Sequence, residues 1–348
     1  MNLRSFVTSF CALTLVSLAA CNSNTSQPEQ AATSTPPAPQ QTSDNKFRVA
    51  LLTPGPVSDA GWNALAYEGL VKVRDELKAE ISQVETKTPA EFEEAFRDYA
   101  SRHFQLIFGH GFEFQDAAAK VSADFPESVF ITTSGSTVRR NVAPIRFMLE
   151  EATYLMGMMS ALVSKTGKAG AIGGVEIPPL KSTFMAFEAG AKSVNPNFQV
   201  IVSYLGNWED VGAAKQAATA LIEQGCDILI PNADAASLGA FQAAQEKKVF
   251  MLGTNKNQND VAPDVTLASG VIDIPSAFLQ IAQEVQKRTF TGRILQLGMK
   301  EKVITLVYNP ALRDRIPPEA QARLDTAQQQ IIAGTLTVPS VEFSPVKP

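Results

Sequence analysis

Short apolar runs alternate with longer amphipathic stretches along most of the chain, beginning at Phe47. The first run, 47–53 (FRVALLT), is largely apolar, as expected of a strand covered on both faces. In the next stretch, 66–77, apolar residues recur at i, i+4, i+7 and i+11, which is one face of a surface helix. Successive strands are separated by about the length of a βαβ unit. The pattern therefore predicts parallel sheets covered by helices.

The same alternation continues to the C-terminal region and predicts two α/β lobes. Further strands are expected at 81–86, 104–108, 128–132, 145–149, 169–172, 198–205, 226–230, 248–252, 265–272 and 303–308, and helices at 151–164, 182–193, 211–224, 235–247 and 275–288. We assign 47–163 with 270–292 to one lobe and 166–268 with 295–345 to the other. Because the chain crosses between the lobes more than once, a hinge and a cleft are expected. Ligands of open parallel sheets bind beyond the carboxyl ends of the strands, which is where this cleft lies.

The first 46 residues lack this alternation. Arg4 precedes an apolar stretch of 15 residues, 6–20, which is short for a membrane span and typical of a signal peptide. Leu18-Ala19-Ala20-Cys21 resembles a bacterial lipobox, so residues 1–20 are a predicted lipoprotein signal peptide and Cys21 a predicted lipidation site. The alternative is an ordinary signal peptide followed by a chance cysteine. Residues 21–46 are rich in Ser, Thr, Pro and Gln, which predicts a disordered tether.

Composition and charge exclude several function classes. The 348 residues are 45% apolar and 19% charged, which is a globular composition. The formal net charge is −5 and no Lys- or Arg-rich run occurs, which argues against a nucleic-acid partner. The three cysteines have no CxxC spacing and only two histidines are present, so we expect no metal site and no cofactor.

The candidate chemistry follows the predicted strands. Each of five strand-end segments contains glycine or proline together with amides, carboxylates or aromatic rings: Pro54–Asn63, Gly109–Glu113, Gly206–Asp210, Pro231–Asp234 and Gly253–Asn257. Because strand ends of two facing lobes meet at the cleft, these segments are expected to converge there.

The only two tryptophans, Trp62 and Trp208, lie in two of these segments, one in each predicted lobe. Two indoles facing each other across a cleft would hold a planar ligand between them, with Asp59, Asn63 and neighbouring amides reading its edge. The alternative is that each indole packs only against its own lobe. Asp59 has an alternative role as well, as the N-cap of the helix that follows it.

Catalytic motifs are missing from the sequence. Lys165–Lys168 lacks the earlier glycine of a P-loop, and no GxSxG is present. His110 lies between two glycines, a position open to a general base, yet it has no evident carboxylate partner. Cys226 opens an apolar strand and is expected to be a small buried hydrophobe. We therefore expect no enzyme activity and no catalytic residues.

The ordered segments resemble one known family, the basic membrane protein (BMP/PnrA-like) lipoproteins, which are substrate-binding components of ABC importers. The similarity rests on Val49–Leu70, Gly109–Phe130, Glu151–Pro196 and Tyr204–Gly225. The resemblance implies a type I periplasmic-binding-protein fold and a purine nucleoside or nucleobase as ligand. It also implies an ABC permease as partner, a monomer, and a lipid anchor at a membrane of the bacterial envelope, facing the periplasm or the outside.

The resemblance also suggests site residues. Asp59 and Asn63 match the acid and amide after the first strand, Phe112 matches a Gly-Phe pair, and Trp208 takes the place of a base-stacking phenylalanine. Asn255 stands where nucleoside binders carry a ribose-binding carboxylate, which favours a free base because a neutral amide holds a hydroxyl less strongly. The predicted ligand-binding set is Asp59, Trp62, Asn63, Phe112, Trp208, Asn232, Asp234 and Asn255. The alternatives are a sensor lipoprotein of the same fold that signals to a receptor, and an enzyme of nucleoside metabolism.

Overall fold

Two six-stranded sheets organise the chain in the computed structural model, which describes residues 46–59 and 61–343. The predicted signal peptide, Cys21 and nearly all of the tether lie outside these residues. The first sheet has the order β11-β5-β4-β3-β1-β2 and all its pairings are parallel. Its strands are β1 (Arg48–Thr53), β2 (Glu80–Glu85), β3 (Leu106–Gly109), β4 (Val129–Thr133), β5 (Val142–Phe147) and β11 (Leu295–Leu297).

The second sheet has the order β12-β10-β9-β8-β6-β7, and only β12 runs antiparallel to its neighbour. The α/β class with two parallel-dominated sheets is therefore confirmed. Its strands are β6 (Lys168–Gly173), β7 (Gln199–Tyr204), β8 (Ile228–Asn232), β9 (Phe250–Asn255), β10 (Thr266–Ile272) and β12 (Ile304–Tyr308).

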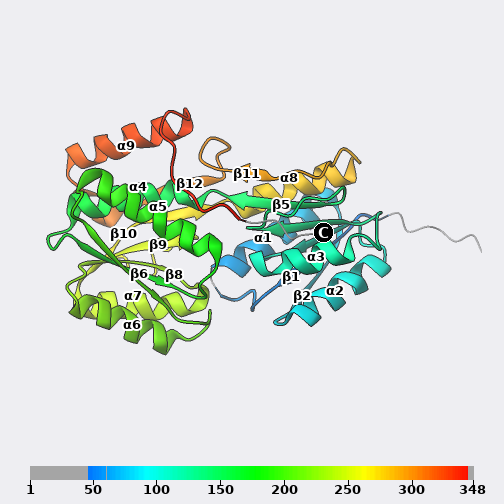
Figure 1. The fold of residues 1–348 in the computed structure, drawn as a ribbon, viewed down its shortest axis with the longest axis horizontal. Helices are drawn as coiled ribbons and strands as arrows, with labels where there is room; N and C mark the ends of the chain where they lie inside the picture. Colours follow the sequence, from blue (N-terminus) through cyan, green and yellow to red (C-terminus); the bar gives the residue numbers. More distant parts are fainter. Residues whose placement is uncertain (1–45, 60, 344–348) are drawn as a thin grey trace, which may run out of the picture. The chain divides into compact units, whose positions relative to one another are not determined.

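Helices cover both faces of each sheet (Figure 1). We call the first sheet with its helices the first lobe, and the second sheet with its helices the second lobe. The first lobe contains α1 (Trp62–Leu77), α2 (Pro89–Ser101), α3 (Gln115–Val121) and α8 (Ile274–Gln286), with the short η1 (Phe112–Phe114). The second contains α4 (Leu149–Val163), α5 (Pro178–Val194), α6 (Val211–Glu223), α7 (Ser237–Lys247) and α9 (Pro318–Ile332), with η2 (Asp234–Ala236) and η3 (Pro310–Arg315).

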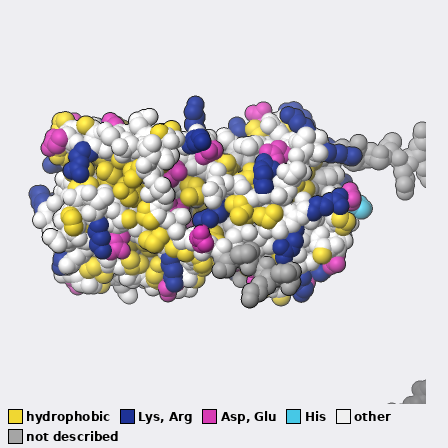
Figure 2. Space-filling view, turned by 45° about the horizontal axis from the view of Figure 1, so that its top comes forward, with side chains coloured by type: hydrophobic (Ala, Val, Ile, Leu, Met, Phe, Trp, Pro, Cys, Tyr) yellow, Lys and Arg dark blue, Asp and Glu magenta, His cyan; other side chains and the backbone are white. Residues whose placement is uncertain are grey.

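Strand periodicity distributes the core over the two faces of each sheet. In β1, Val49 and Leu51 pack into the cluster that contains α1 and α8, whereas Ala50 and Leu52 pack with α2 and α3. This is the two-residue alternation of a strand that is buried on both sides. On the face shown in Figure 2, basic and acidic side chains are interspersed over both lobes, and no basic patch is visible there.

The sheets divide the chain at residues different from the predicted lobe boundaries. Helix α4, expected in the first lobe, packs against α5 of the second. Strand β11, within a segment expected in the second lobe, pairs with β5 of the first. Neither arrangement could be predicted, because apolar periodicity marks a buried face without identifying its partner, and β11 has only three residues.

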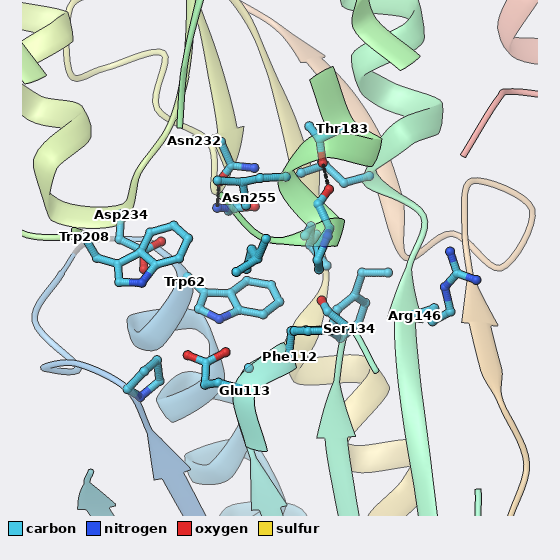
Figure 3. Close-up of a pocket in the computed structure, with 18 of the residues that line it drawn as sticks. Trp62, Phe112, Glu113, Ser134, Arg146, Thr183, Trp208, Asn232, Asp234 and Asn255 are labelled. Atoms are coloured by element: carbon cyan, nitrogen blue, oxygen red, sulfur yellow. Dashed lines mark hydrogen bonds between the residues drawn. The ribbon is translucent and has the colours of Figure 1, made fainter. Parts of the chain in front are cut away.

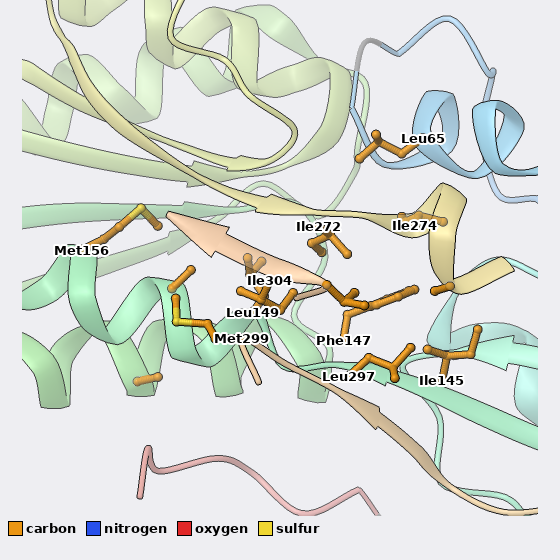
Figure 4. Close-up of a cluster of buried hydrophobic side chains, with 14 of the residues drawn as sticks. Leu65, Ile145, Phe147, Leu149, Met156, Ile272, Ile274, Leu297, Met299 and Ile304 are labelled. Atoms are coloured by element: carbon orange, nitrogen blue, oxygen red, sulfur yellow. The ribbon is translucent and has the colours of Figure 1, made fainter. Parts of the chain in front are cut away.

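The chain crosses between the lobes three times, after β5, after β10 and between β11 and β12. The crossings are joined by backbone hydrogen bonds: Met148 N–H donates to Leu297 O (3.0 Å) and Asp273 N–H donates to Val303 O (2.8 Å). Apolar side chains from all three crossings, including Phe147, pack together around them (Figure 4). The predicted hinge therefore corresponds to three chain crossings that are joined by hydrogen bonds and surrounded by apolar side chains.

Candidate functional site

A cavity lies between the two lobes at the carboxyl ends of their strands. Its walls come from the segments after β1, β3, β4, β6, β7 and β8, together with the ends of β5, β8, β9 and β10, the first turns of α1, α4 and α5, and the C-terminal segment. Six of the eight predicted ligand-binding residues line it: Trp62, Phe112, Trp208, Asn232, Asp234 and Asn255 (Figure 3). Asp59 and Asn63 lie in a smaller adjoining recess, which Trp208 and Asp234 also line.

Trp62 reaches the cavity from the first turn of α1 with its indole supported from behind. The ring stacks on the imidazole of His110, with 4.1 Å between centroids and 25° between planes. The imidazole Nε2–H donates to the backbone oxygen of Trp62 (3.0 Å), and its Nδ1 lies 3.3 Å from the hydroxyl of Thr133. Burial lowers the pKa of His110 to about 3, so the ring is neutral at pH 7. His110 is therefore a support for Trp62, and its ring nitrogens contact a carbonyl and a hydroxyl.

Trp208 enters the cavity from the opposite lobe, from the loop between β7 and α6. Its six-membered ring lies directly on the backbone of Gly174: a Cβ there would be only 2.1 Å from Cε3 of the indole. Any larger residue at position 174 would displace the ring. Figure 3 shows both indoles in the same cavity, carried by different lobes.

The amides of Asn232 and Asn255 form a pair at the ends of β8 and β9. The Asn255 side-chain nitrogen donates to the Asn232 side-chain oxygen (3.0 Å). Both side chains are more than nine-tenths buried and line the cavity. The bond leaves the nitrogen of Asn232 and the oxygen of Asn255 for a ligand, which gives one donor and one acceptor side by side.

Three residues that follow strands at the cavity have positive φ: Ser134 after β4 (64°), Asp234 after β8 (47°) and Asn255 at the end of β9 (68°). Residues other than glycine seldom adopt this conformation, and it is found preferentially at binding sites. The turns thus direct short polar side chains into the cavity.

Asp59 lies just before helix α1. Its carboxylate accepts hydrogen bonds from the backbone N–H groups of Gly61 (3.0 Å), Asn63 (2.8 Å) and Ala64 (2.9 Å). The N-cap residue itself is Gly61, so the predicted N-cap position was wrong by two residues, although the Asp59 carboxylate does accept hydrogen bonds from the N-terminus of this helix. Asn63 is 2% exposed, and its side-chain oxygen is buried without a hydrogen-bond partner.

Acidic groups dominate the charge of the cavity. Glu113, Asp234 and Glu150 line it, with Arg146 as the basic residue. Burial raises the pKa of Glu113 to about 7. Burial, followed by the nearby charges of Asp59 and Glu113, raises the pKa of Asp234 well above its usual range. A carboxyl group with a raised pKa keeps its proton more readily, so it can donate as well as accept a hydrogen bond from a neutral ligand.

The end of the cavity that holds Arg146 combines side chains that the sequence did not reveal as site residues. Arg146 lies on β5, Glu150 lies in the first turn of α4, and Phe343 is near the C-terminus. Arg146 and Glu150 lie within a strand and a helix, where a single charged residue does not match any sequence motif. Phe343 lies beyond the last predicted strand. The only sequence signal for it is that it is an isolated aromatic residue in a polar tail. Glu113 belongs to a predicted strand-end segment, although it was not among the predicted site residues.

Within the described residues, no group of three or more His, Cys, Asp or Glu side chains is placed to hold a metal ion. Cys226 is buried, as expected from its apolar strand. In the same part of the chain, no helix is long and apolar enough to cross a bilayer.

Two α/β lobes, three crossings and a cavity of aromatic and polar residues between strand ends define a two-lobed solute-binding protein. The model of the family described as ABC transporter substrate-binding protein PnrA-like matches residues 46–342. The chain therefore belongs to this family, and the resemblance found in the sequence is confirmed.

Individual relatives agree with this assignment. Basic membrane protein A2 of Borrelia garinii is 30% identical over 302 residues, covering 84% of this chain and 88% of that protein. A purine-binding protein of Brucella abortus is 29% identical over 300 residues, covering 84% and 85%. An ABC transporter solute-binding protein of Aeropyrum pernix has a TM-score of 0.77 at 22% identity, covering 84% of this chain and 94% of that one, which confirms the expected fold.

Proposed function

We propose that this substrate-binding protein captures a planar purine, a free base or its nucleoside, outside the cytoplasm and delivers it to an ABC permease. The observation that carries the proposal is the placement of the only two tryptophans, Trp62 and Trp208, in one cavity from opposite lobes. An indole ring can stack on any flat heteroaromatic ring. A similar protein from Brucella abortus is named as purine-binding.

The polar groups of the cavity support the same class of ligand. The free amide nitrogen of Asn232 and the free amide oxygen of Asn255 match the alternating donors and acceptors of a purine edge. The carboxyl groups of Glu113, Asp234 and Glu150 can accept hydrogen bonds from ring N–H and amino groups or, when protonated, donate to ring nitrogens, and burial of a phosphate beside them would raise the cost of ionising them. Because an amide at 255 replaces the carboxylate expected in nucleoside binders, we expect free bases to bind at least as well as nucleosides.

Titration of the purified protein with six purines tests the proposal: adenine, guanine, hypoxanthine, adenosine, guanosine and inosine. Tryptophan fluorescence reports binding directly, since the chain has only these two indoles. At least one free base should quench it and bind as tightly as its nucleoside, and adenosine monophosphate should not bind. Much tighter binding of the nucleosides would contradict the interpretation of Asn255. Binding of a sugar or an amino acid, with none of the six purines, would exclude the purine proposal.

We further propose that Cys21 is lipidated after removal of residues 1–20, and that the tether places the two lobes outside a membrane of the envelope. The position of Cys21 after Leu18-Ala19-Ala20 supports this. Cys21→Ser should release the protein into the soluble fraction or leave it unprocessed. Normal processing with unchanged membrane retention would count against lipidation.

A further inference from the structure

The chain after α9 returns to the cavity and is held there by both lobes. In Figure 1 this segment descends from α9 between the lobes. The backbone N–H of Val341 donates to Ser182 Oγ on α5 (2.9 Å), and the guanidinium of Arg146 on β5 donates to the Val341 oxygen (3.3 Å). A single residue of the tail is thus bound by side chains from opposite sides of the hinge.

Val341 is the first donor of a buried hydrogen-bond chain. The backbone N–H of Val341 donates to the hydroxyl of Ser182, and this hydroxyl donates in turn to Glu150 Oε1. Ser182 is fully buried and Glu150 is 4% exposed. Loss of the tail would leave this hydroxyl without its donor beside the cavity, and incomplete polar networks are costly.

Phe343 closes the end of the cavity next to Arg146. Its side chain lines the cavity and is 8% exposed, although it is near the C-terminus. The guanidinium carbon of Arg146 lies 4.2 Å from the ring centroid, and the ring of Phe112 meets it edge-on at 5.8 Å. The phenyl ring therefore packs against the guanidinium of Arg146 at this end of the cavity.

We propose that the segment Ser340–Phe343 is a wall of the ligand cavity and that Phe343 is a specificity-determining residue that limits how far a ligand extends toward Arg146. This inference rests on the proposed function and goes beyond it. A flat base held at the indoles leaves the phenyl ring in place, whereas a longer ligand meets it. Removal of the ring opens space and exposes a guanidinium that can bind hydroxyl or phosphate oxygens.

The selectivity test compares adenine with adenosine on the full-length protein, using calorimetry on wild type, Phe343→Ala and Phe343→Leu. Phe343→Ala should raise the adenosine-to-adenine affinity ratio by about tenfold or more, since the space of a phenyl ring becomes available. Phe343→Leu keeps most of the bulk and should stay within about twofold of wild type. An unchanged ratio in a folded Phe343→Ala protein, or an equal loss for both ligands, would overturn the role in specificity.

A second measurement tests the wall without any purine. Hydrogen exchange of the Val341 amide should be slow in the ligand-free protein and faster in Ser182→Ala, because its acceptor is gone. Fast exchange in the wild type would overturn the assignment of the segment as a wall. If wild type bound no purine at all, the proposed function would fail while this measurement would still decide the position of the segment.

Discussion

Trp62 offers a preformed surface because its indole rests on His110 before any ligand arrives. A ring fixed in advance loses little conformational freedom on binding. Trp62→Ala and Trp208→Ala should each reduce affinity for the bound purine by about 1–3 kcal/mol, roughly 5- to 150-fold, through loss of stacking. Calorimetry provides the measurement, with the exposed Tyr67→Ala on α1 as a control of unchanged affinity. Unchanged affinity in both tryptophan variants would show that the indoles only pack against their own lobes and do not stack on the ligand.

Glu113 makes stability depend on pH. Its pKa is about 7 in the folded protein against an ordinary 4.5, so the folded state holds a proton that the unfolded state has lost between these values. Its contribution to stability is complete below pH 4.5 and is lost as the pH rises through 7, by on the order of 2–3 kcal/mol. Glu113→Gln should therefore lose less stability than wild type between pH 5 and 8 in urea titrations. Parallel pH profiles for the two proteins would contradict this.

The strand-end residues of the cavity could be predicted from the sequence, but their contacts could not. Trp62 and Trp208 were singled out because tryptophan is rare and both follow strands. For Asp59 the sequence left a binding role and a capping role open, and three backbone donors occupy its carboxylate in the structure. Arg146 and Phe343 meet only after the chain has folded, and no spacing along the sequence records a contact between residues so far apart.

Helices α4 and α5 pack unusually closely, and two glycines permit it. A Cβ at Gly190 would lie 1.9 Å from the backbone oxygen of Tyr154, and one at Gly157 would lie 1.9 Å from that of Phe187. The approach also brings the hydroxyl of Thr153 to the backbone oxygen of Thr183 (3.0 Å), next to the cavity. The helix pair thus sets the position of the wall that carries Ser182 and Thr183.

Gly190→Ala should lower the free energy of unfolding by about 1–3 kcal/mol, because the added methyl group forces the helices apart. Glu188→Ala, on the exposed side of the same helix, removes only a surface ion pair with Lys192 and should change it by less than about 0.5 kcal/mol. Urea denaturation of the two variants gives the comparison. Equal stability of Gly190→Ala and wild type would show that the helices can separate without cost.

Element prediction succeeded where the chain is strongly periodic. Strands β1 to β10 and β12 and helices α1 and α4 to α8 fall near their expected ranges. No strand is expected at β11 and no helix at α2, α3 or α9. β11 has three residues, α3 has seven, and α9 has few apolar positions to form a stripe, whereas α2 does have an apolar stripe at Phe92, Phe96 and Tyr99, which the prediction missed. The lobe of α4 could not be assigned from the sequence for a different reason. This helix is apolar around most of its circumference, so its sequence fits either sheet.

Two ion pairs connect the lobes beside the cavity. Lys256 Nζ on the segment after β9 lies 2.8 Å from Glu68 Oε1 on α1, and Lys87 Nζ lies 3.8 Å from Glu209 Oε1. Pairs of this kind can form only when the lobes are close together. They would therefore favour the closed arrangement by a small amount, while the ligand supplies most of the closing free energy.

Glu68→Gln should weaken purine binding by less than about 1 kcal/mol, or about fivefold, and the effect should shrink at high salt. Lys215→Gln is the matched control, because its partner Glu246 lies in the same lobe (2.6 Å) and no affinity change is expected. Small-angle scattering with and without the purine should show compaction in all three proteins. A scattering profile indifferent to a tightly bound purine would contradict closure.

The three crossings have a consequence for the order in which the molecule can be assembled. Strand β11 completes the first sheet beside β5, and α8 covers α1, yet both are synthesised after most of the second lobe. A chain that is synthesised from its N-terminus therefore has an unpaired β5 edge and an uncovered apolar face until residue 297 has been added. Chains that end before α8 would therefore not form a stable first lobe. They would be degraded by proteases or would aggregate through the β5 edge.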